Sequence, residues 1–332
     1  MPAQEAKLSV AVTGPTGTFG FGLIPLLQDE ERVGTIVGIA RRPFDPSEHG
    51  WTKMDYRRGD VRDVVELERA FDGSDVVVHL AFLITGTASR ETIREINVDG
   101  TVSAFRAAAA AGAKRFVYAS SVAAYGFHRD NPIGMTEEWP VRRADHLFYA
   151  QEKAEIEEVL RGEATGSDVD LYLLRPPVVL GPHAVGAKDV LPSPLSGFAG
   201  RLIGAMRRAP LGAPVPVPDL PVQFIHEDDV GQAFALCIVG AGPPGEYNIA
   251  GDGVLSMREV ARELGLQPIP VPAGPVKTIA RAIASLPFAP PAAEWAEAAS
   301  HPAIMDASKA KRELGWSPRF DSLAALRATF AD

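Results

Sequence analysis

A tyrosine and a lysine stand four residues apart, at Tyr149 and Lys153, in a segment whose apolar residues recur at helical spacing. In an α-helix this spacing places both side chains on one face, about one turn apart, so both can reach one small molecule. A phenol with an ordinary pKa near 10 transfers protons poorly at neutral pH unless a cation stabilises the phenolate. The pair predicts proton transfer by Tyr149 with Lys153 as the cation, the alternative being an exposed helix pair.

Three glycines follow the first apolar run and precede a helical segment: Gly14, Gly17 and Gly20. Glycines permit a tight turn and close backbone approach, while a helix N-terminus offers free N–H groups and a positive dipole end to a pyrophosphate. The order strand, glycine loop, helix predicts dinucleotide binding, and a plain tight turn is the alternative. The expected contacts of this loop are Gly14, Thr16, Gly17, Thr18, Phe19 and Gly20.

The residues after the second apolar run should decide which dinucleotide is bound. An acidic residue there holds a ribose 2′-hydroxyl, whereas arginine accommodates a 2′-phosphate. The chain reads Ala40-Arg41-Arg42 at this point, with no acid before Asp45. We therefore expect NADP(H), held by Arg41 and Arg42. NAD(H) is the alternative, with both arginines as solvated surface residues.

Apolar runs alternate with helix-like segments through the first half of the chain. Nearly continuous apolar strands separated by helices indicate a parallel sheet covered on both faces, so the fold class is a Rossmann-type, doubly wound α/β sheet. The expected strands are 9–13, 35–40, 76–80, 115–120 and 170–174, and the expected helices are 21–28, 64–71, 91–111 and 144–161.

Two serines, Ser120 and Ser121, end the fourth of these strands. Doubly wound proteins bind their ligands at the carboxyl edge of the sheet. A hydroxyl at this position can hydrogen-bond the oxygen that Tyr149 protonates, the alternative being a mere turn residue at the end of a strand.

Prolines interrupt the regular pattern after Arg175. Because proline fixes φ and removes a hydrogen-bond donor, 176–221 should be loops with one helix at 196–208. A second proline-rich block, 268–291, leads to a helical tail that carries Trp295 and Trp316.

These changes in composition divide the chain into two parts. We expect a dinucleotide-binding domain over 1–175, whose sheet is completed by about 222–250, with 222–230 and 246–250 returning to it. A smaller C-terminal substrate-binding lid should comprise 176–221 and 251–332.

Together these motifs resemble the extended short-chain dehydrogenases/reductases, the group of NAD-dependent epimerases, dehydratases and ketone reductases, over nearly the whole chain. The resemblance implies that Ser121, rather than Ser120, acts with Tyr149 and Lys153, and that Lys153 also holds the nicotinamide ribose. It assigns Asn97 to supporting the nearby helix and a water relay, the alternative being a satisfied mid-helix amide. The further segments that carry the resemblance are Gly59-Asp60-Val61, His79-Leu80-Ala81, Asn97-Val98-Asp99-Gly100-Thr101, Tyr118 to Gly126, Leu174-Arg175-Pro176, Phe224 to Val230 and Leu314-Gly315-Trp316.

The resemblance also implies contacts and an assembly. Helices 91–111 and 144–161 are where family members form homodimers, so a homodimer is implied here. The implied cofactor contacts beyond the glycine loop and the two arginines are Asp60, Val61, Leu80, Ala81, Lys153, Pro176 and Val178.

The chain departs from family members that act on nucleotide sugars. Two positions that hold the diphosphate in those proteins fall here in apolar stretches, Pro177-Val178-Val179 and Pro221-Val222, although Arg201, Arg207 or Arg208 could substitute. The lid is rich in Pro, Leu, Gly and Ala, which favours an apolar carbonyl compound as the substrate.

Three functions therefore stay open, of which the first is favoured. It is NADP(H)-dependent interconversion of a carbonyl and a secondary alcohol on an apolar molecule. The second is an NAD-dependent nucleotide-sugar epimerase or dehydratase, although Val122 and Ala123 replace the acidic pair that a dehydratase should carry after the serine. The third is a non-catalytic dinucleotide sensor, which would need only the glycine loop.

Composition excludes other classes. The net charge of −9 and pI near 5.4 disfavour nucleic acid and anionic membranes as partners. The single cysteine, Cys237, permits no intramolecular disulfide and no Cys-based metal cage, and no residue is assigned to a metal. Apolar stretches are interrupted before the length of a membrane span, and the N-terminus lacks a signal-peptide pattern, so a cytoplasmic location is expected.

Overall fold

The computed structural model describes residues 6–84, 89–145, 147–184, 214–271 and 301–330 of the 332-residue chain. The helix expected at 196–208, Trp295, most of the block 268–291 and the three arginines at 201, 207 and 208 lie outside these residues.

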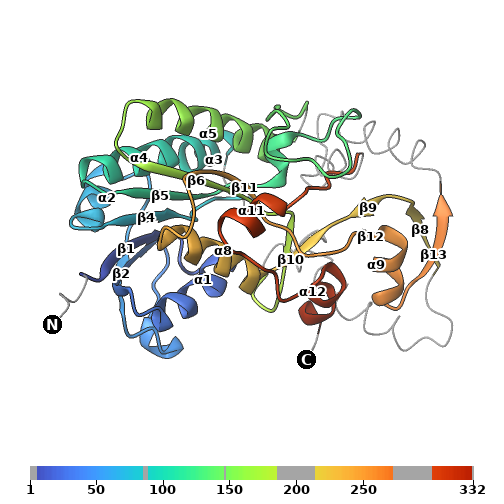
Figure 1. The fold of residues 1–332 in the computed structure, drawn as a ribbon, viewed down its shortest axis with the longest axis horizontal. Helices are drawn as coiled ribbons and strands as arrows, with labels where there is room; N and C mark the ends of the chain where they lie inside the picture. The colour runs from blue at the N-terminus through green and yellow to red at the C-terminus, as the bar shows by residue number, and fades with distance from the viewer. Residues whose placement is uncertain (1–5, 85–88, 146, 185–213, 272–300, 331–332) are drawn as a thin grey trace.

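A seven-stranded sheet forms the centre of the molecule, and all its strand pairs are parallel (Figure 1). Buried β-branched runs such as Val76-Val77-Val78 form its middle strands, which confirms the doubly wound parallel sheet. In sheet order, the strands are β11 (Gly245–Asn248), β6 (Asp170–Arg175), β5 (Arg115–Ala119), β4 (Val76–His79), β1 (Leu8–Thr13), β2 (Val33–Ala40) and β3 (Met54–Arg58).

One edge strand, β3, was not expected from the sequence. It reads Met-Asp-Tyr-Arg-Arg and pairs only with β2 within the described sheet. Because an edge strand leaves much of its surface to solvent, β3 needs no apolar run, and three of its five residues are exposed.

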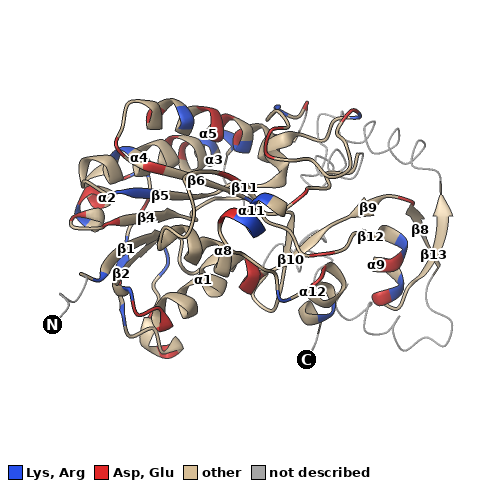
Figure 2. Ribbon diagram, in the orientation of Figure 1, with Lys and Arg blue, Asp and Glu red and all other residues tan. Residues whose placement is uncertain are grey.

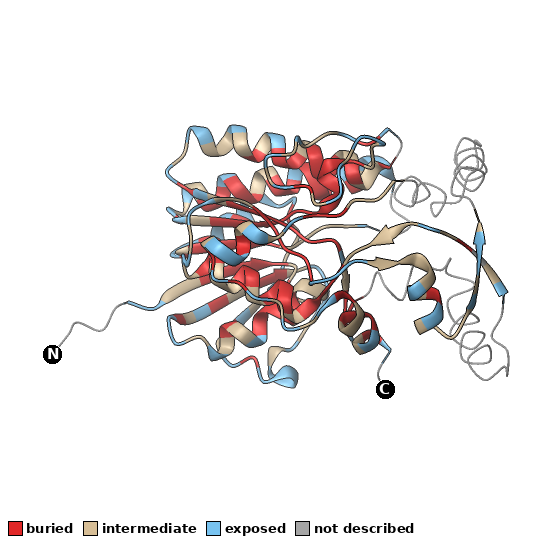
Figure 3. Cartoon of the chain, turned by 45° about the vertical axis from the view of Figure 1, so that its right-hand side comes forward, coloured by how far each residue is buried: buried red, intermediate tan, exposed pale blue. Residues whose placement is uncertain are grey.

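Helices cover both faces of the sheet (Figure 1). On one face, α1 (Thr18–Asp29) and α8 (Glu227–Ile238) bury residues such as Leu23 and Phe234 in a shared core. On the other face, α2 (Val64–Phe71), α4 (Gly100–Ala110) and α5 (Phe148–Thr165) form a second core. Figure 3 shows the buried residues concentrated in these layers, and Figure 2 shows acidic and basic residues mixed along α5.

Three expected helices differ in their limits, the first of them only because α1 begins three residues before the expected 21–28 and ends one residue after it. The single helix expected at 91–111 is divided into α3 (Arg90–Arg94), a π-helical turn at Glu95–Asp99 and α4. This turn carries Asn97, and π-helical turns often occur at functional sites. Helix α5 begins and ends four residues later than expected, because the buried residues 144 and 147 belong to the preceding segment.

Short strands outside the main sheet carry the proline-rich segments. They form three two-stranded pairs: β7 (Val178–Leu180) with β10 (Phe224–His226), β9 (Pro221–Val222) with β12 (Leu255–Ser256), and β8 (Pro214–Pro218) with β13 (Gln267–Val271). Of the two segments expected to return to the main sheet, 246–250 does so through β11. Residues 222–230 add no strand to it, because β10 pairs with β7 instead.

The C-terminal segment packs partly on the main core. Trp316 is almost fully buried there, and its indole Nε1 donates to the Asp229 carbonyl (2.9 Å). The helices α9 (Met257–Glu263), α11 (Ser308–Glu313) and α12 (Ser322–Thr329) complete the described elements. No helix within the described ranges is long and apolar enough to cross a membrane.

The backbones of α1 and α8 meet at two glycines, Gly22 and Gly231. A Cβ at Gly231 would lie 2.1 Å from the Gly22 carbonyl oxygen, whereas a Cβ at Gly162 on α5 would meet nothing within 4 Å. We expect Gly231→Ala to lower the free energy of unfolding by about 3 kcal/mol through overpacking. The control Gly162→Ala should raise it by about 1 kcal/mol through helix propensity. Urea unfolding measures both, and equal effects would contradict the close contact.

Candidate active site

The carboxyl ends of β1, β4 and β5 bring the predicted site residues to one edge of the sheet. Thr13 pairs with His79, and His79 with Tyr118, so the segments that follow these strands are neighbours. They are the glycine loop, Leu80-Ala81 and Ser120-Ser121. Helix α5, which carries Tyr149 and Lys153, lies beside the end of β5.

The three glycines each meet a different requirement. A Cβ at Gly14, where φ is +69°, would lie 2.9 Å from the Ala81 nitrogen, and a Cβ at Gly20 would lie 1.9 Å from the Pro15 carbonyl oxygen. The nearest atom to a Cβ at Gly17 is the Gly14 oxygen at 3.5 Å. The loop is thus closely packed against β4 and α1 at its ends and open at Gly17, as close approach of a pyrophosphate requires.

The N-terminus of α1 completes this cradle. Its N-cap residue is Gly17, which has no side chain that could cap the first turn. The first turn carries no acidic residue. The backbone N–H groups and positive dipole end are therefore not neutralised by a side chain from the cap or an acid in that turn, which fits an anionic diphosphate.

A buried histidine that the sequence analysis assigned only to a motif links these strands. His79 Nδ1 lies 2.9 Å from Thr13 Oγ1, and its Nε2 lies 3.1 Å from Thr101 Oγ1. Burial lowers the pKa of His79 to about 3, assisted by the charge of Lys153, so the ring is neutral. Because Ala81 N donates to Thr13 Oγ1 (3.3 Å), the network also fixes the residues after β4.

The buried amide of Asn97 holds the loop after β4. Its Oδ1 accepts from Leu83 N (2.7 Å), and its Nδ2 donates to Leu83 O (3.0 Å) and Glu152 Oε2 (2.7 Å). The contact with Glu152 reaches α5, as the predicted support of the nearby helix requires, and the full set of partners also fits the alternative, a satisfied amide. The predicted water relay stays a prediction.

The Tyr149 phenol meets the predicted serine. Tyr149 is half-buried, its phenol lies close enough to the Ser121 side chain for the serine to influence its pKa, and the Phe82 ring lies edge-on against it (5.5 Å between centroids). Burial raises the pKa of Tyr149, and the Ser121 hydroxyl only partly offsets this effect. The Ser121 hydroxyl also accepts from Ala123 N (3.1 Å), which caps a 3-10 turn at Val122–Tyr125.

Lys153 contacts β5 rather than the phenol. Its Nζ donates to Tyr118 Oη (3.1 Å) and to the Ala119 carbonyl (2.6 Å), and lies 5.8 Å from the centroid of the Tyr149 ring. Desolvation lowers the pKa of Lys153 to about 7, against the opposing charges of Glu157 and Glu152. The expected lowering of the phenol pKa by Lys153 is not found, because the ammonium is directed at β5; burial and Ser121 set the pKa of Tyr149.

Basic residues surround the ends of β2 and β3. Arg41 and Arg42 are exposed, and Arg58 Nε donates to the Arg41 carbonyl (3.0 Å). The Asp60 carboxylate is held by Arg62 through its Nη2 (2.9 Å) and Nε (3.1 Å), which lowers the pKa of Asp60. The next residue, Val61, is buried against Gly100.

Two further predicted contacts lie at the entrance to β7. Pro176 is buried, and its carbonyl accepts from Val122 N (2.9 Å), the residue after Ser121. Val178 is 54% exposed. Nearby, the Gln223 side-chain amide forms two hydrogen bonds to the backbone of Met305 (3.0 and 3.1 Å), and Val222 pairs with Leu255.

Known proteins resemble this chain over half of its length or more. The protein y4nG of Sinorhizobium fredii is 27% identical over 332 residues (96% of this chain, 77% of that protein). Human 3 beta-hydroxysteroid dehydrogenase type 7 is 33% identical over 185 residues, about half of each chain (50% and 47%). The structure of the Bordetella bronchiseptica enzyme WbmG in complex with NAD and UDP has a TM-score of 0.71 at 21% identity (99% of this chain, 94% of that one).

A family model covers the sheet, the glycine loop, both serines and helix α5. It describes the NAD dependent epimerase/dehydratase family and matches residues 10–250, from β1 through β11. The motifs quoted from the sequence lie within this range apart from Leu314-Gly315-Trp316. The chain belongs to the NAD dependent epimerase/dehydratase family, the extended short-chain dehydrogenases/reductases that its motifs predicted.

Proposed function

We propose that this chain is an NADP(H)-dependent oxidoreductase that interconverts a carbonyl group and a secondary alcohol on an apolar small molecule. Membership of the family supports an enzyme that uses a nicotinamide dinucleotide. The observation that carries the proposed chemistry is that Ser121, Tyr149 and Lys153 lie together at the sheet edge where the glycine loop also lies.

Two hydroxyl groups act on the substrate oxygen. A bound nicotinamide dinucleotide, held by the glycine loop and the α1 N-terminus, supplies or accepts the hydride at carbon. In reduction, Tyr149 donates its proton to the carbonyl oxygen as the new C–H bond forms, and the Ser121 hydroxyl hydrogen-bonds that oxygen. Because burial keeps the pKa of Tyr149 high, the phenol is protonated at neutral pH and suits the general acid of reduction.

Lys153 stabilises the phenolate that remains after this proton transfer. Its ammonium lies on the same face of α5 as Tyr149 and is anchored by β5. The Phe82 ring, 3.8 Å from Nζ, and burial keep water away, which strengthens the electrostatic effect of the cation.

The described part of the lid favours an apolar substrate. The Gln223 side chain is already hydrogen-bonded to the backbone of Met305, and Val222 lies in a strand pair. The exposed side chain of Val178 offers no charge to a diphosphate. The likeness to a hydroxysteroid dehydrogenase is in line with this substrate class.

A nucleotide-sugar epimerase or dehydratase is the second candidate. The WbmG complex contains NAD and UDP, and this likeness supports the second candidate at least as well as the first. Dehydration is the less favoured of its two reactions, because Val122 and Ala123 occupy the turn after Ser121.

The arginines near β2 support a preference for NADP(H). Arg41 and Arg42 are exposed at the end of β2, and the charge of Arg41 reaches Asp60, next to Arg62. A 2′-phosphate placed at this edge would find guanidinium partners.

The first test separates the candidate reactions. We expect purified protein to consume NADPH with apolar ketones, and Tyr149→Phe to lower kcat at least about 100-fold through loss of the general acid. Tyr172→Phe, whose hydroxyl contacts the Gly242 carbonyl, is the control and should retain activity. Absorbance of the reduced nicotinamide follows the reaction. Epimerisation of UDP-glucose without net consumption would support the second candidate instead, and inertness toward both substrates would leave the dinucleotide sensor.

The second test uses the depressed pKa of Lys153. Because the ammonium loses its proton as pH rises through about 7, the catalytic cation is present below this pH and lost above it. We expect kcat/KM for reduction to fall with one ionisation as pH rises past about 7. Lys153→Met should be at least about 100-fold slower and should lack this ionisation. A wild-type profile that stays flat from about pH 6 to 9 would contradict the assignment.

The third test addresses cofactor choice. We expect Arg41→Ala and Arg42→Ala to raise KM for NADPH about 10- to 100-fold, because each removes a charge-assisted contact to the 2′-phosphate. KM for NADH should stay within about twofold, since NADH lacks that phosphate. Arg69→Ala, in an exposed pair with Glu66 on α2, is the matched control. Equal effects on both cofactors would argue for NAD(H).

A further inference from the structure

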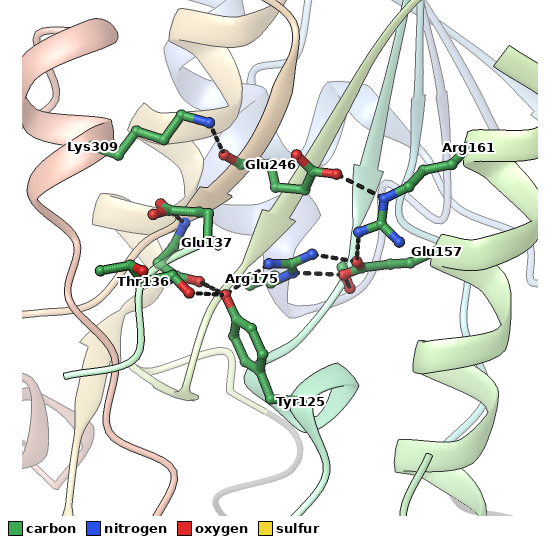
Figure 4. A network of polar contacts seen from close by, with 10 residues as sticks. Tyr125, Thr136, Glu137, Glu157, Arg161, Arg175, Glu246 and Lys309 are labelled. Carbon is green, nitrogen blue, oxygen red and sulfur yellow. Dashed lines mark hydrogen bonds and ion pairs between the residues drawn. The ribbon is translucent and has the colours of Figure 1, made fainter. Parts of the chain in front are cut away.

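A buried ion pair joins Glu157 of α5 to Arg175 at the end of β6 (Figure 4). Glu157 and Arg175 are 0% and 1% exposed, and Arg175 donates to both carboxylate oxygens of Glu157, through Nε (2.9 Å) and through Nη2. Burial alone would raise the pKa of Glu157, but Arg175, Arg161 and Ser120 together hold it below its ordinary value. The pair therefore stays charged out of solvent, where losing either partner leaves an unpaired charge.

The same ion pair contacts both ends of the turn that contains Ser121. On one side, the Ser120 hydroxyl donates to Glu157 Oε1. On the other side, Arg175 Nη1 donates to the hydroxyl of Tyr125 (2.7 Å), the last residue of the 3-10 turn that Ser121 caps. Ser121 thus stands between two side chains that are joined to one buried ion pair.

A backbone hydrogen bond adds a third attachment. Val122, the residue after Ser121, donates from N to the carbonyl of Pro176 (2.9 Å), the residue after Arg175. Tyr125 in turn donates to Asn248 Oδ1 (2.8 Å), and Asn248 Nδ2 donates to the Met135 and Asp306 carbonyls. The turn is held against the ends of β6 and β11.

The ion pair also reaches the helix that carries the other two predicted groups. Glu157 lies one turn after Lys153 on the same face of α5. The position of the Ser121 turn is therefore tied to α5 through Glu157, so Ser121 and Tyr149 share one support.

We propose that Glu157 and Arg175 are positioning residues that hold Ser121 beside Tyr149, acting through Ser120 and Tyr125. Neither residue contacts the reacting atoms. This inference rests on the proposed function, because it assigns a purpose to the geometry of the same site. Misplacement of a catalytic group by about 1 Å can cost as much as 100-fold in rate, so such a support has a measurable effect.

The test removes the two attachments without removing the ion pair. Ser120→Ala deletes the contact to Glu157, and Tyr125→Phe deletes the acceptor for Arg175. Arg161→Ala is the matched control, since Arg161 Nη2 also donates to Glu157 Oε2 (2.7 Å) but is half-exposed and contacts neither residue. Thermal unfolding of each variant, followed by circular dichroism, establishes the temperature range in which it is folded.

Two readouts are measured on the folded proteins. We expect Ser120→Ala and Tyr125→Phe each to lower kcat about 10-fold with an unchanged KM for the dinucleotide, and Arg161→Ala to stay within about twofold of wild type. The second readout needs no substrate. Tyrosine labelled with 13C at Cζ gives resonances from six tyrosines, and Tyr149→Phe assigns that of Tyr149.

The Tyr149 resonance should move in both variants, and its titration midpoint should rise because the nearby Ser121 side chain lowers the pKa of Tyr149. A resonance unmoved from wild type, or a kcat within about twofold of it, would overturn the positioning role. Should the wild type turn over none of the substrates tested, the proposed function fails, and the resonance alone still decides whether the ion pair positions Ser121.

Discussion

Glu157, Arg175 and Lys153 are charged side chains that lie almost entirely out of solvent, and each depends on its neighbours for its charge. Arg175 keeps Glu157 ionised, and Glu157 with Glu152 favours the charged form of Lys153 against desolvation. Because these groups stand on α5 and β6, their mutual attraction fixes the helix against the carboxyl edge of the sheet. The placement of Tyr149 and Ser121 follows from this arrangement of buried charge.

The dinucleotide side of the site depends on a different constraint, the close approach of backbones. Gly14 allows the loop to contact the residues after β4, and Gly20 allows it to contact the start of α1. The neutral His79 on β4 is hydrogen-bonded to Thr13 on β1 and to Thr101 on α4, so it links these elements without adding charge. An uncharged glycine cradle and the charged edge that carries the predicted catalytic groups thus meet at the ends of β1, β4 and β5.

The segments after Arg175, which we predict to form a lid, would distinguish the candidate functions. The Gln223 amide and the Val222 strand pair show that two positions near the entrance are used for packing between segments. Hydride transfer at the sheet edge is common to an oxidoreductase and to an epimerase or dehydratase. The two candidate functions therefore differ in the contacts that the predicted lid would make with a substrate. A diphosphate needs charged or polar partners, whereas an apolar carbonyl compound needs surface that excludes water.

The sequence by itself determined the parallel sheet, the glycine loop and the family, because buried strands read as apolar runs and a dinucleotide loop needs glycine at set positions. It also brought Ser121 and Tyr149 to the same edge through the order of strands. Only the tertiary structure showed which residues support Ser121 and Tyr149. The polar edge strand β3, the π-helical turn at Asn97, the contacts of Lys153 with β5 and the Glu157–Arg175 pair join residues distant in the sequence. Such contacts arise from packing, and spacing along one chain does not encode them.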